Sequence, residues 1–188
     1  MPTTPHDTRL TYQDLLLFPD DGLRHEIING EHFVTPSPNL RHQELVLRLA
    51  VSLSNYLEER PDDGRVFIAP FDVVFSFHDI VEPDVIFVAP DQLDILTAKN
   101  IQGTPAMVVE ILSPSTRKRD QQIKRTLYDR VGVREYWLVD PEMNAISIYR
   151  RQTDGSLPLI ASLFAAGHDT LSTPLLPGWS VELPRLFR

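Results

Sequence analysis

The sequence contains no cysteine among its 188 residues. Disulfide bonds, thiolate catalysis and cysteine-bound zinc are therefore excluded, and any metal ion must be held by oxygen or imidazole ligands. The chain also lacks an uncharged apolar run of the roughly 18 residues that a membrane-spanning helix needs, and its N-terminus lacks the basic and apolar regions of a signal peptide. We therefore expect a cytoplasmic protein.

Glycine is sparse, and the eight glycines are scattered rather than gathered into a phosphate-binding loop. The sequence has neither a His-Glu-x-x-His zinc motif nor a Gly-x-Ser-x-Gly nucleophile motif. Nucleotide-dependent chemistry and the hydrolases that carry these two motifs are therefore not expected.

Basic residues are outnumbered by acidic ones, and the net charge is -8. Taken alone, this charge disfavours a nucleic-acid partner, because phosphate binding requires a basic surface. The segment 117–134 is the exception, with seven Lys and Arg residues against two Asp residues. Such a segment is either a solvated surface or a surface that faces phosphate.

Length and residue patterns predict a single α/β domain over residues 1–188. A helix opens at Thr11 with capping-box spacing, and Asn29-Gly30 predicts a β-hairpin because a type I′ turn needs two positive φ angles. Ser37 and Pro38 offer an N-cap and a first helical residue. Periodicity predicts a long amphipathic helix over 38–59, a weaker helical stretch over 91–98, and a last helix that starts between 115 and 120 and ends at Gly132. Apolar runs bounded by turn residues predict strands over 66–77, 81–88 and 106–112. A strand pair over 135–140 and 145–150 and short strands in the tail follow.

Two carboxylates lie in apolar runs that are typical of strands. Asp84 directly precedes the run 85–88, and Glu110 interrupts the run 106–112. The flanking Val and Ile residues predict that both carboxylates are buried, and a buried charge is costly unless a cation or a donor answers it. The pair therefore suggests a metal site, and the alternative for Asp84 is a turn-capping role.

The last long helix carries a polar face beside an apolar stripe. Asp120, Lys124 and Tyr128 share this face at spacings of four residues. The stripe that we expect to be buried consists of Ile123, Leu127 and Val131. Because the helix follows the strand 106–112 by a few residues, the two should pack together and bring Lys124 towards the carboxylates. The alternative is an ordinary solvated lysine.

Three short motifs, in this order, resemble the PD-(D/E)XK nuclease superfamily: Pro83-Asp84, Glu110-Ile111-Leu112 and Lys124-x-x-x-Tyr128. Longer strings over 25–31, 37–43, 109–115, 132–141 and 174–178 resemble the Uma-two family of "putative restriction endonucleases". The resemblance implies an αβββαβ core with a mixed central sheet, an N-terminal hairpin and extra C-terminal strands. Where the superfamily has a lysine two residues after the acid, this chain has Leu112, and Lys124 would supply the lysine from the following helix.

The resemblance also implies a divalent-metal-dependent endonuclease that hydrolyses DNA phosphodiester bonds. Asp84, Glu110 and the backbone carbonyl of Ile111 would bind Mg²⁺ or Mn²⁺, and Lys124 would be the catalytic lysine. The supporting residues would be Glu26 as a third carboxylate, Tyr128 as a positioner of Lys124 and His42 as a contact near the site. A homodimer is expected by analogy with nucleases that cut both strands.

Other interpretations stay open at this point. Glu26 could face solvent in the hairpin, His42 is expected on the exposed start of its helix, and Asp72 is a further candidate for a supporting carboxylate. For the whole protein, the alternative is a catalytically inactive nuclease fold that serves as a binding or assembly module. A third reading is hydrolysis of RNA or of a smaller phosphoester by the same site.

Overall fold

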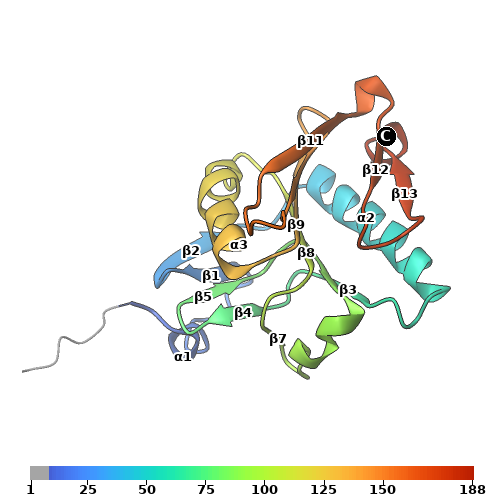
Figure 1. Ribbon diagram of the computed structural model, residues 1–188. Coiled ribbons are helices and arrows are strands. Elements are labelled where there is room, and N and C mark those ends of the chain that lie inside the picture. The colour runs from blue at the N-terminus through green and yellow to red at the C-terminus, as the bar shows by residue number, and fades with distance from the viewer. Residues whose placement is uncertain (1–8) are drawn as a thin grey trace, which may run out of the picture.

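The computed structural model describes residues 9–188, so the expectation that residues 1–7 form no signal peptide lies outside it. The larger sheet has six strands in the order β11-β10-β9-β8-β6-β3 (Figure 1). Its strands are β3 (Arg65–Ile68), β6 (Val85–Val88), β8 (Met107–Ile111), β9 (Glu135–Asp140), β10 (Ala145–Arg150) and β11 (Leu159–Phe164). Because β8 and β9 run parallel and the other neighbours antiparallel, the sheet is mixed, as predicted.

A second sheet of five strands, in the order β2-β1-β5-β4-β7, contains the N-terminal hairpin. Its strands are β1 (Arg24–Ile28), β2 (Glu31–Thr35), β4 (Val73–Ser76), β5 (Asp79–Val81) and β7 (Ile101–Gln102). Asn29 and Gly30 connect β1 and β2 with φ angles of 53° and 79°, which confirms the predicted type of turn. The hairpin thus forms one end of the second sheet.

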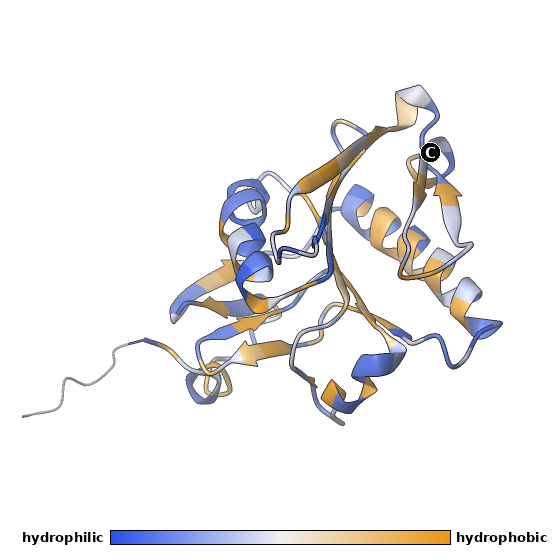
Figure 2. Cartoon of the chain, viewed as in Figure 1, coloured by the Kyte–Doolittle hydropathy of each residue, from blue (hydrophilic) through white to orange (hydrophobic). Residues whose placement is uncertain are grey.

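The six-stranded sheet is covered on both faces. Helix α2 (Leu40–Glu58) packs on one face, and α3 (Arg125–Val131) and the five-stranded sheet pack on the other (Figure 1). Side chains alternate between the faces, since Val109 of β8 contacts the α2 side and Val108 the α3 side. In Figure 2 apolar and polar residues alternate along α2, and its Leu45, Leu49 and Leu53 pack against the sheet. Glu110 therefore points to the same side as Val108.

The C-terminal segment completes the α2 side of the molecule. Strands β12 (Thr170–Ser172) and β13 (Ser180–Glu182) pair with each other, and α4 (Leu183–Leu186) follows them. Trp179 stacks on Trp137 of β9, with 5.7 Å between the ring centroids. The predicted short strands of the tail thus form a cover over this half of the core.

Two predicted strands are each interrupted. The run 66–77 divides into β3 and β4, and the run 81–88 lies in β5 and β6, so each run contributes to both large sheets. Pro70 and Pro83 lie in the breaks, and proline cannot donate a hydrogen bond to a neighbouring strand. The second break has a functional consequence, because it places Asp84 where the chain passes from one sheet to the other.

The helices also differ from prediction in their ends. Asn39 caps α2 by accepting a hydrogen bond from the backbone N–H of His42, so Ser37 is not the N-cap. Helix α1 (Tyr12–Leu15) has the predicted capping box between Thr11 and Asp14. The stretch predicted over 91–98 is the 3₁₀ helix η1 (Pro90–Ile95), and a second 3₁₀ turn, η3 (Ala165–Gly167), follows β11.

The last long helix begins as a π-helix, η2 (Arg119–Lys124), and continues as α3. It ends at Gly132, whose φ of 89° confirms the predicted left-handed residue. Within residues 9–188, no helix is long and apolar enough to cross a membrane. The single domain and the cytoplasmic location stay predictions.

Candidate active site

The six side chains singled out from the sequence lie close together around the crossing between the two large sheets. Asp84 comes from the crossing before β6, Glu110 from β8, Lys124 from η2, Glu26 from β1, Tyr128 from α3 and His42 from α2. All six side chains are buried, and none is more than 4% exposed. Since η2 and α3 form one continuous helix, five segments far apart in the sequence supply one polar cluster inside an otherwise apolar core.

Asp84 is surrounded by nitrogen donors. Its Oδ1 accepts a hydrogen bond from Nη1 of Arg24 at 2.8 Å. Its Oδ2 accepts one from the backbone N–H of Ile111 at 2.8 Å and lies 3.0 Å from Nε2 of His42. Burial alone would raise the pKa of Asp84, but the His42 hydrogen bond and the charges of His42 and Arg24 hold this pKa below its usual value. Asp84 is thus an ionised carboxylate in a buried place.

Glu110 and Glu26 share one ammonium group. Nζ of Lys124 lies 2.6 Å from Oε1 of Glu26 and 2.8 Å from Oε1 of Glu110, and 4.0 Å from Oδ1 of Asp120. Burial raises the pKa of Glu110 to about 8, even though Lys124 opposes this shift. Burial would lower the pKa of Lys124, but the neighbouring carboxylates raise it. Three carboxylates therefore compete for one buried positive charge.

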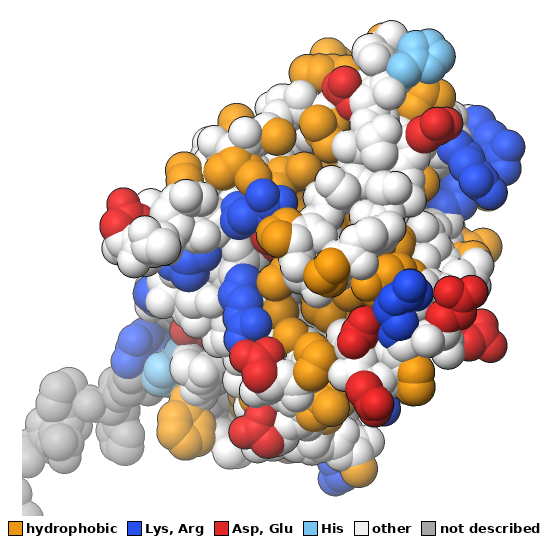
Figure 3. All heavy atoms as spheres, turned by 45° about the vertical axis from the view of Figure 1, so that its right-hand side comes forward, with side chains coloured by type: hydrophobic (Ala, Val, Ile, Leu, Met, Phe, Trp, Pro, Cys, Tyr) orange, Lys and Arg blue, Asp and Glu red, His pale blue; other side chains and the backbone are white. Residues whose placement is uncertain are grey.

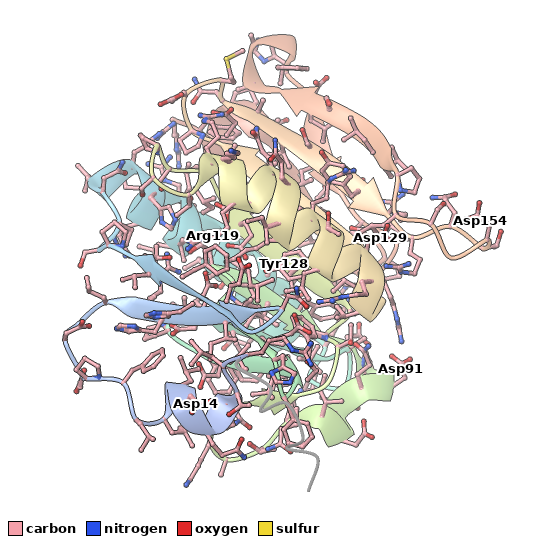
Figure 4. The ribbon with its side chains drawn as sticks, turned by 90° about the vertical axis from the view of Figure 1, so that its left-hand side faces the viewer. Asp14, Asp91, Arg119, Tyr128, Asp129 and Asp154 are labelled. Atoms are coloured by element: carbon pink, nitrogen blue, oxygen red, sulfur yellow. The ribbon has the colours of Figure 1, made fainter. Side chains whose placement is uncertain are left out.

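Tyr128 contacts the acid rather than the lysine. Its hydroxyl donates a hydrogen bond to Oε1 of Glu110 at 2.5 Å. Tyr128 and Lys124 thus share one acceptor oxygen, and the role of Tyr128 as a positioner of Lys124 stays a prediction. Figure 4 shows Tyr128 and Arg119 where the helix meets the β1–β2 hairpin, with Asp129 towards the far end of the helix.

The π-turn explains which helix residues face this cluster. Asp120, Lys124 and Tyr128, which their spacing placed on one face beside the apolar stripe, are all buried. The apolar stripe is wrong at one position, since Ile123 is 39% exposed whereas Leu127 is buried. A π-helix closes i→i+5 hydrogen bonds, so its wider turn shifts Ile123 away from the core. The prediction for Ile123 was based on an α-helical period over the whole helix, which does not hold in the π-helical turn.

Two further expectations from the sequence are corrected. His42 lies in the first turn of α2 but is not exposed, because this turn packs against the crossing that holds Asp84. Glu26 does not face solvent, since it is 1% exposed and accepts a hydrogen bond from the backbone N–H of Glu82. Asp72 accepts a hydrogen bond from the hydroxyl of Tyr12 at 3.5 Å and does not line the cavity described below, which opens onto Asp84 and Glu110.

A cavity of about 190 Å³ opens onto the cluster. The loops before α2 and before η2 supply proline and hydroxyl residues to its walls. The titratable residues in its lining are Arg24, His42, Asp84, Glu110, Arg119, Asp120 and Lys124, and Ile111 also lines it. A larger cavity of about 820 Å³ lies between α2 and the C-terminal segment, but Glu182 is the one acidic side chain in its lining. The smaller cavity is therefore the chemical candidate.

Unsatisfied polar atoms gather around this cavity. Five buried side-chain atoms of residues 9–188 have no hydrogen-bond partner: Glu26 Oε2, His42 Nδ1, Glu82 Oε2, Arg119 Nε and Asp120 Oδ1. All five belong to the cluster or to its immediate neighbours. Buried polar atoms are normally hydrogen-bonded, so five unpaired ones close together are not explained by the stability of the fold and indicate a functional site. In the described chain, no group of three or more His, Asp or Glu side chains forms a ready-made metal site.

Two arginines of the site have no signal in the sequence that sets them apart. Arg24 is one polar residue of its strand, and Arg119 is one of the seven cations of the basic segment 117–134. Arg119 contacts Thr35 and lies 3.5 Å from Oε2 of Glu26. Both arginines became recognisable only once the hairpin was placed against the carboxylates, so no local pattern could have identified them.

The basic segment is largely neutralised by acidic partners. Five of its seven cations, namely Arg117, Arg119, Lys124, Arg130 and Arg134, form ion pairs with carboxylates. Arg125 instead lies over the ring of Tyr149. On the face seen in Figure 3, basic and acidic side chains are interspersed. The segment is therefore not a free basic stripe of the kind that follows a duplex backbone.

The mixed sheet, with buried carboxylates at its centre and a helical lysine against them, defines a restriction-endonuclease-like α/β fold. The chain belongs to the Uma2 family, described as "Putative restriction endonuclease", whose family model matches residues 11–184. This confirms the resemblance seen in the sequence.

A solved structure confirms the fold. It is a "putative nuclease belonging to DUF820" from Anabaena variabilis ATCC 29413, with a TM-score of 0.78 and 18% sequence identity. The similarity covers 95% of this chain and 97% of that one. Among curated proteins, none matches the chain.

Proposed function

We propose that this protein is a divalent-metal-dependent endonuclease that hydrolyses DNA phosphodiester bonds. The observation that carries this proposal is the convergence of Asp84, Glu110 and Lys124, from three separate elements, on one cavity. The family match over residues 11–184 supports it independently. Asp84 and Glu110 are the proposed metal ligands, with the backbone carbonyl of Ile111 as a third, and Lys124 is the proposed catalytic lysine.

The donor set fits Mg²⁺ or Mn²⁺ in its chemistry. Carboxylate and carbonyl oxygens are the ligands that these hard cations prefer. Three carboxyl groups, those of Glu26, Glu110 and Asp120, lie within 4.0 Å of Lys124 or Arg119, which carry two positive charges between them. Glu26 Oε2 and Asp120 Oδ1 have no hydrogen-bond partner, although Arg119 lies within 4.0 Å of both. When bound, such an ion supplies Lewis-acid polarisation of the phosphate and lowers the pKa of water from about 15.7 towards neutrality.

The remaining groups hold and orient charge. Lys124 is fixed by Glu26 and Glu110, so its ammonium can offset the negative charge that develops on the phosphate in the transition state. Tyr128 restrains Glu110, and His42 together with the Ile111 backbone restrains Asp84. Burial of these groups excludes bulk water, which strengthens each electrostatic contact.

One observation favours the second candidate, an inactive nuclease fold that serves as a binding or assembly module. Both oxygens of Asp84 are already occupied by protein donors. Titration with Mn²⁺ separates the candidates, because a module of this kind should show no binding that depends on Asp84. The homodimer stays a prediction, which sedimentation velocity would measure.

The direct test is cleavage of plasmid DNA, single-stranded circular DNA and RNA in the presence of Mg²⁺ or Mn²⁺. The wild type should cut at least the DNA, and Asp84→Asn should not. A matched control is Asp140→Asn, which removes a carboxylate bound to Arg117 outside the cavity. Equal activity of the wild type and Asp84→Asn would remove the assignment, and cleavage of RNA alone would change the substrate class.

A further inference from the structure

Arg24 is the most exposed cation of the site. It begins β1, and its guanidinium donates to Oδ1 of Asp84 at 2.8 Å and to the backbone carbonyl of Glu82 at 3.4 Å. Its side chain is 19% exposed, compared with 11% for Arg119 and 3% for Lys124. Arg24 therefore lies between solvent and the buried carboxylates.

The two oxygens of Asp84 have partners of different kinds. Oδ2 is held by the backbone N–H of Ile111 and by His42, which a strand and a helix fix in place. Oδ1 is held by the end of the long side chain of Arg24. A divalent cation at Oδ1 would be repelled by the guanidinium charge, which lies 2.8 Å from that oxygen, so its binding favours the departure of Arg24. This departure requires only rotations of one side chain.

A second cavity offers the displaced guanidinium a place. It measures about 350 Å³ and shares Arg24, His42 and Asp84 with the cavity of the carboxylates. Its walls include Leu23, Gln43 and Val46, together with two acidic residues, Asp20 and Glu82, so Arg24 is its one arginine or lysine. Arg24 thus lies where the two cavities meet. Its planar guanidinium has the geometry that binds phosphate oxygens in pairs.

We propose that Arg24 is an exchange residue that determines the affinity for substrate. It neutralises Asp84 when no metal is bound, leaves Oδ1 when a divalent cation binds, and then binds a phosphate of the nucleic acid in the adjoining cavity. This inference rests on the proposed function, and it assigns two successive partners to one side chain. Lys124 and Arg119 cannot take this role, because both are held by Glu26.

The test measures Mn²⁺ affinity by calorimetry without nucleic acid, and then cleavage kinetics, for the wild type and Arg24→Gln. Since the substitution removes a competitor of the cation, we expect Mn²⁺ to bind about five- to tenfold more tightly. Cleavage should show the opposite effect, with KM raised about tenfold and kcat changed less. A residue that merely holds Asp84 in place would weaken Mn²⁺ binding as well as cleavage.

The matched control is Arg117→Gln, which removes an arginine bound to Asp140 and Glu142 outside both cavities. Arg117→Gln should leave both the Mn²⁺ affinity and the KM for cleavage unchanged. Equal or weaker Mn²⁺ binding by Arg24→Gln would overturn the exchange. If Arg24→Gln does not fold, Arg24→Lys keeps the charge but loses the paired geometry, and an unchanged KM in that variant would overturn the phosphate contact.

Failure of the proposed function has a different signature. If Arg24→Gln binds Mn²⁺ more tightly but no nucleic acid is cut, the exchange at Asp84 is supported and the nuclease activity is overturned. If neither the wild type nor Arg24→Gln binds Mn²⁺, both proposals are overturned.

Discussion

Two buried glutamates on neighbouring strands have opposite surroundings. Glu135 of β9 and Glu110 of β8 are 1% and 3% exposed. Glu135 has its own donors, since Arg150 contacts its Oε1 and the indole of Trp137 donates to its Oε2 at 2.8 Å. Glu110 shares Lys124 with Glu26, and its pKa is raised to about 8.

The comparison shows that burial of an acid does not by itself indicate function. Glu135 lies on the α2 side of the sheet, with one cation and one N–H donor for its two oxygens, as a structural carboxylate should. Glu110 lies on the α3 side, beside a cavity and other carboxylates. Because Glu110 is buried, its ionisation is unfavourable, as its raised pKa indicates. A divalent cation would remove that cost, which is why we assign the chemistry to Glu110.

The largest expected difference is in activity. Glu110→Gln should reduce DNA cleavage by about 100- to 1,000-fold, because it removes a charged ligand of the proposed metal ion. Glu135→Gln should keep most of the activity per folded molecule. Initial rates of plasmid cleavage at saturating Mg²⁺ measure both variants, and similar losses in the two would contradict the distinction.

The order should reverse for stability. Glu135→Gln should lower the free energy of unfolding by about 1 to 3 kcal/mol, because Arg150 loses its charged partner. Glu110→Gln should leave this free energy unchanged or raise it, since it removes one of the carboxylates that compete for Lys124. Urea denaturation in EDTA gives both values. A large destabilisation by Glu110→Gln would show that Glu110 is structural.

The stability difference should also depend on pH. In the folded protein the pKa of Glu110, about 8, lies above its usual value of 4.5. A raised carboxyl pKa means that the folded state binds the proton more tightly, so stability falls as the pH rises from about 4.5 to about 8. The wild type should therefore lose stability relative to Glu110→Gln across this range, in EDTA. A constant difference between the two proteins would refute the predicted shift.

The smallest effect is expected for Tyr128→Phe. The change removes the hydroxyl that donates to Glu110 but keeps the buried ring. We expect kcat to fall by about tenfold or less and stability to change by about 1 kcal/mol. Tyr136→Phe is a suitable control, because the Tyr136 hydroxyl donates to the backbone of Asp120 instead. Equal effects of the two variants on kcat would argue against a specific role of Tyr128.

The sequence predicted what depends on local signals. The Asn29-Gly30 turn, the strands Glu135–Asp140 and Ala145–Arg150, and the left-handed Gly132 were all predicted correctly, because turn residues and alternation determine them. Asp84 and Glu110 stood out because acids are rare in apolar strands. The short connection between the strand and the helix indicated that Lys124 approaches these carboxylates, and the family resemblance implied its catalytic role.

What the sequence did not predict depends on tertiary contacts. The π-turn that exposes Ile123 and the burial of His42 follow from how the helices pack on the carboxylates. Arg24 has no signal in its own strand, because its partner Asp84 is 60 residues away. Such pairs become visible only when the hairpin and the sheet crossing are placed together.

Calorimetric titration with Mn²⁺ of the wild type, Glu110→Gln and Glu135→Gln is the most direct test of whether the acid cluster binds a cation. The account predicts that the wild type and Glu135→Gln bind the ion and that Glu110→Gln loses most of this affinity. Equal affinity in all three proteins, or no binding by the wild type, would contradict it.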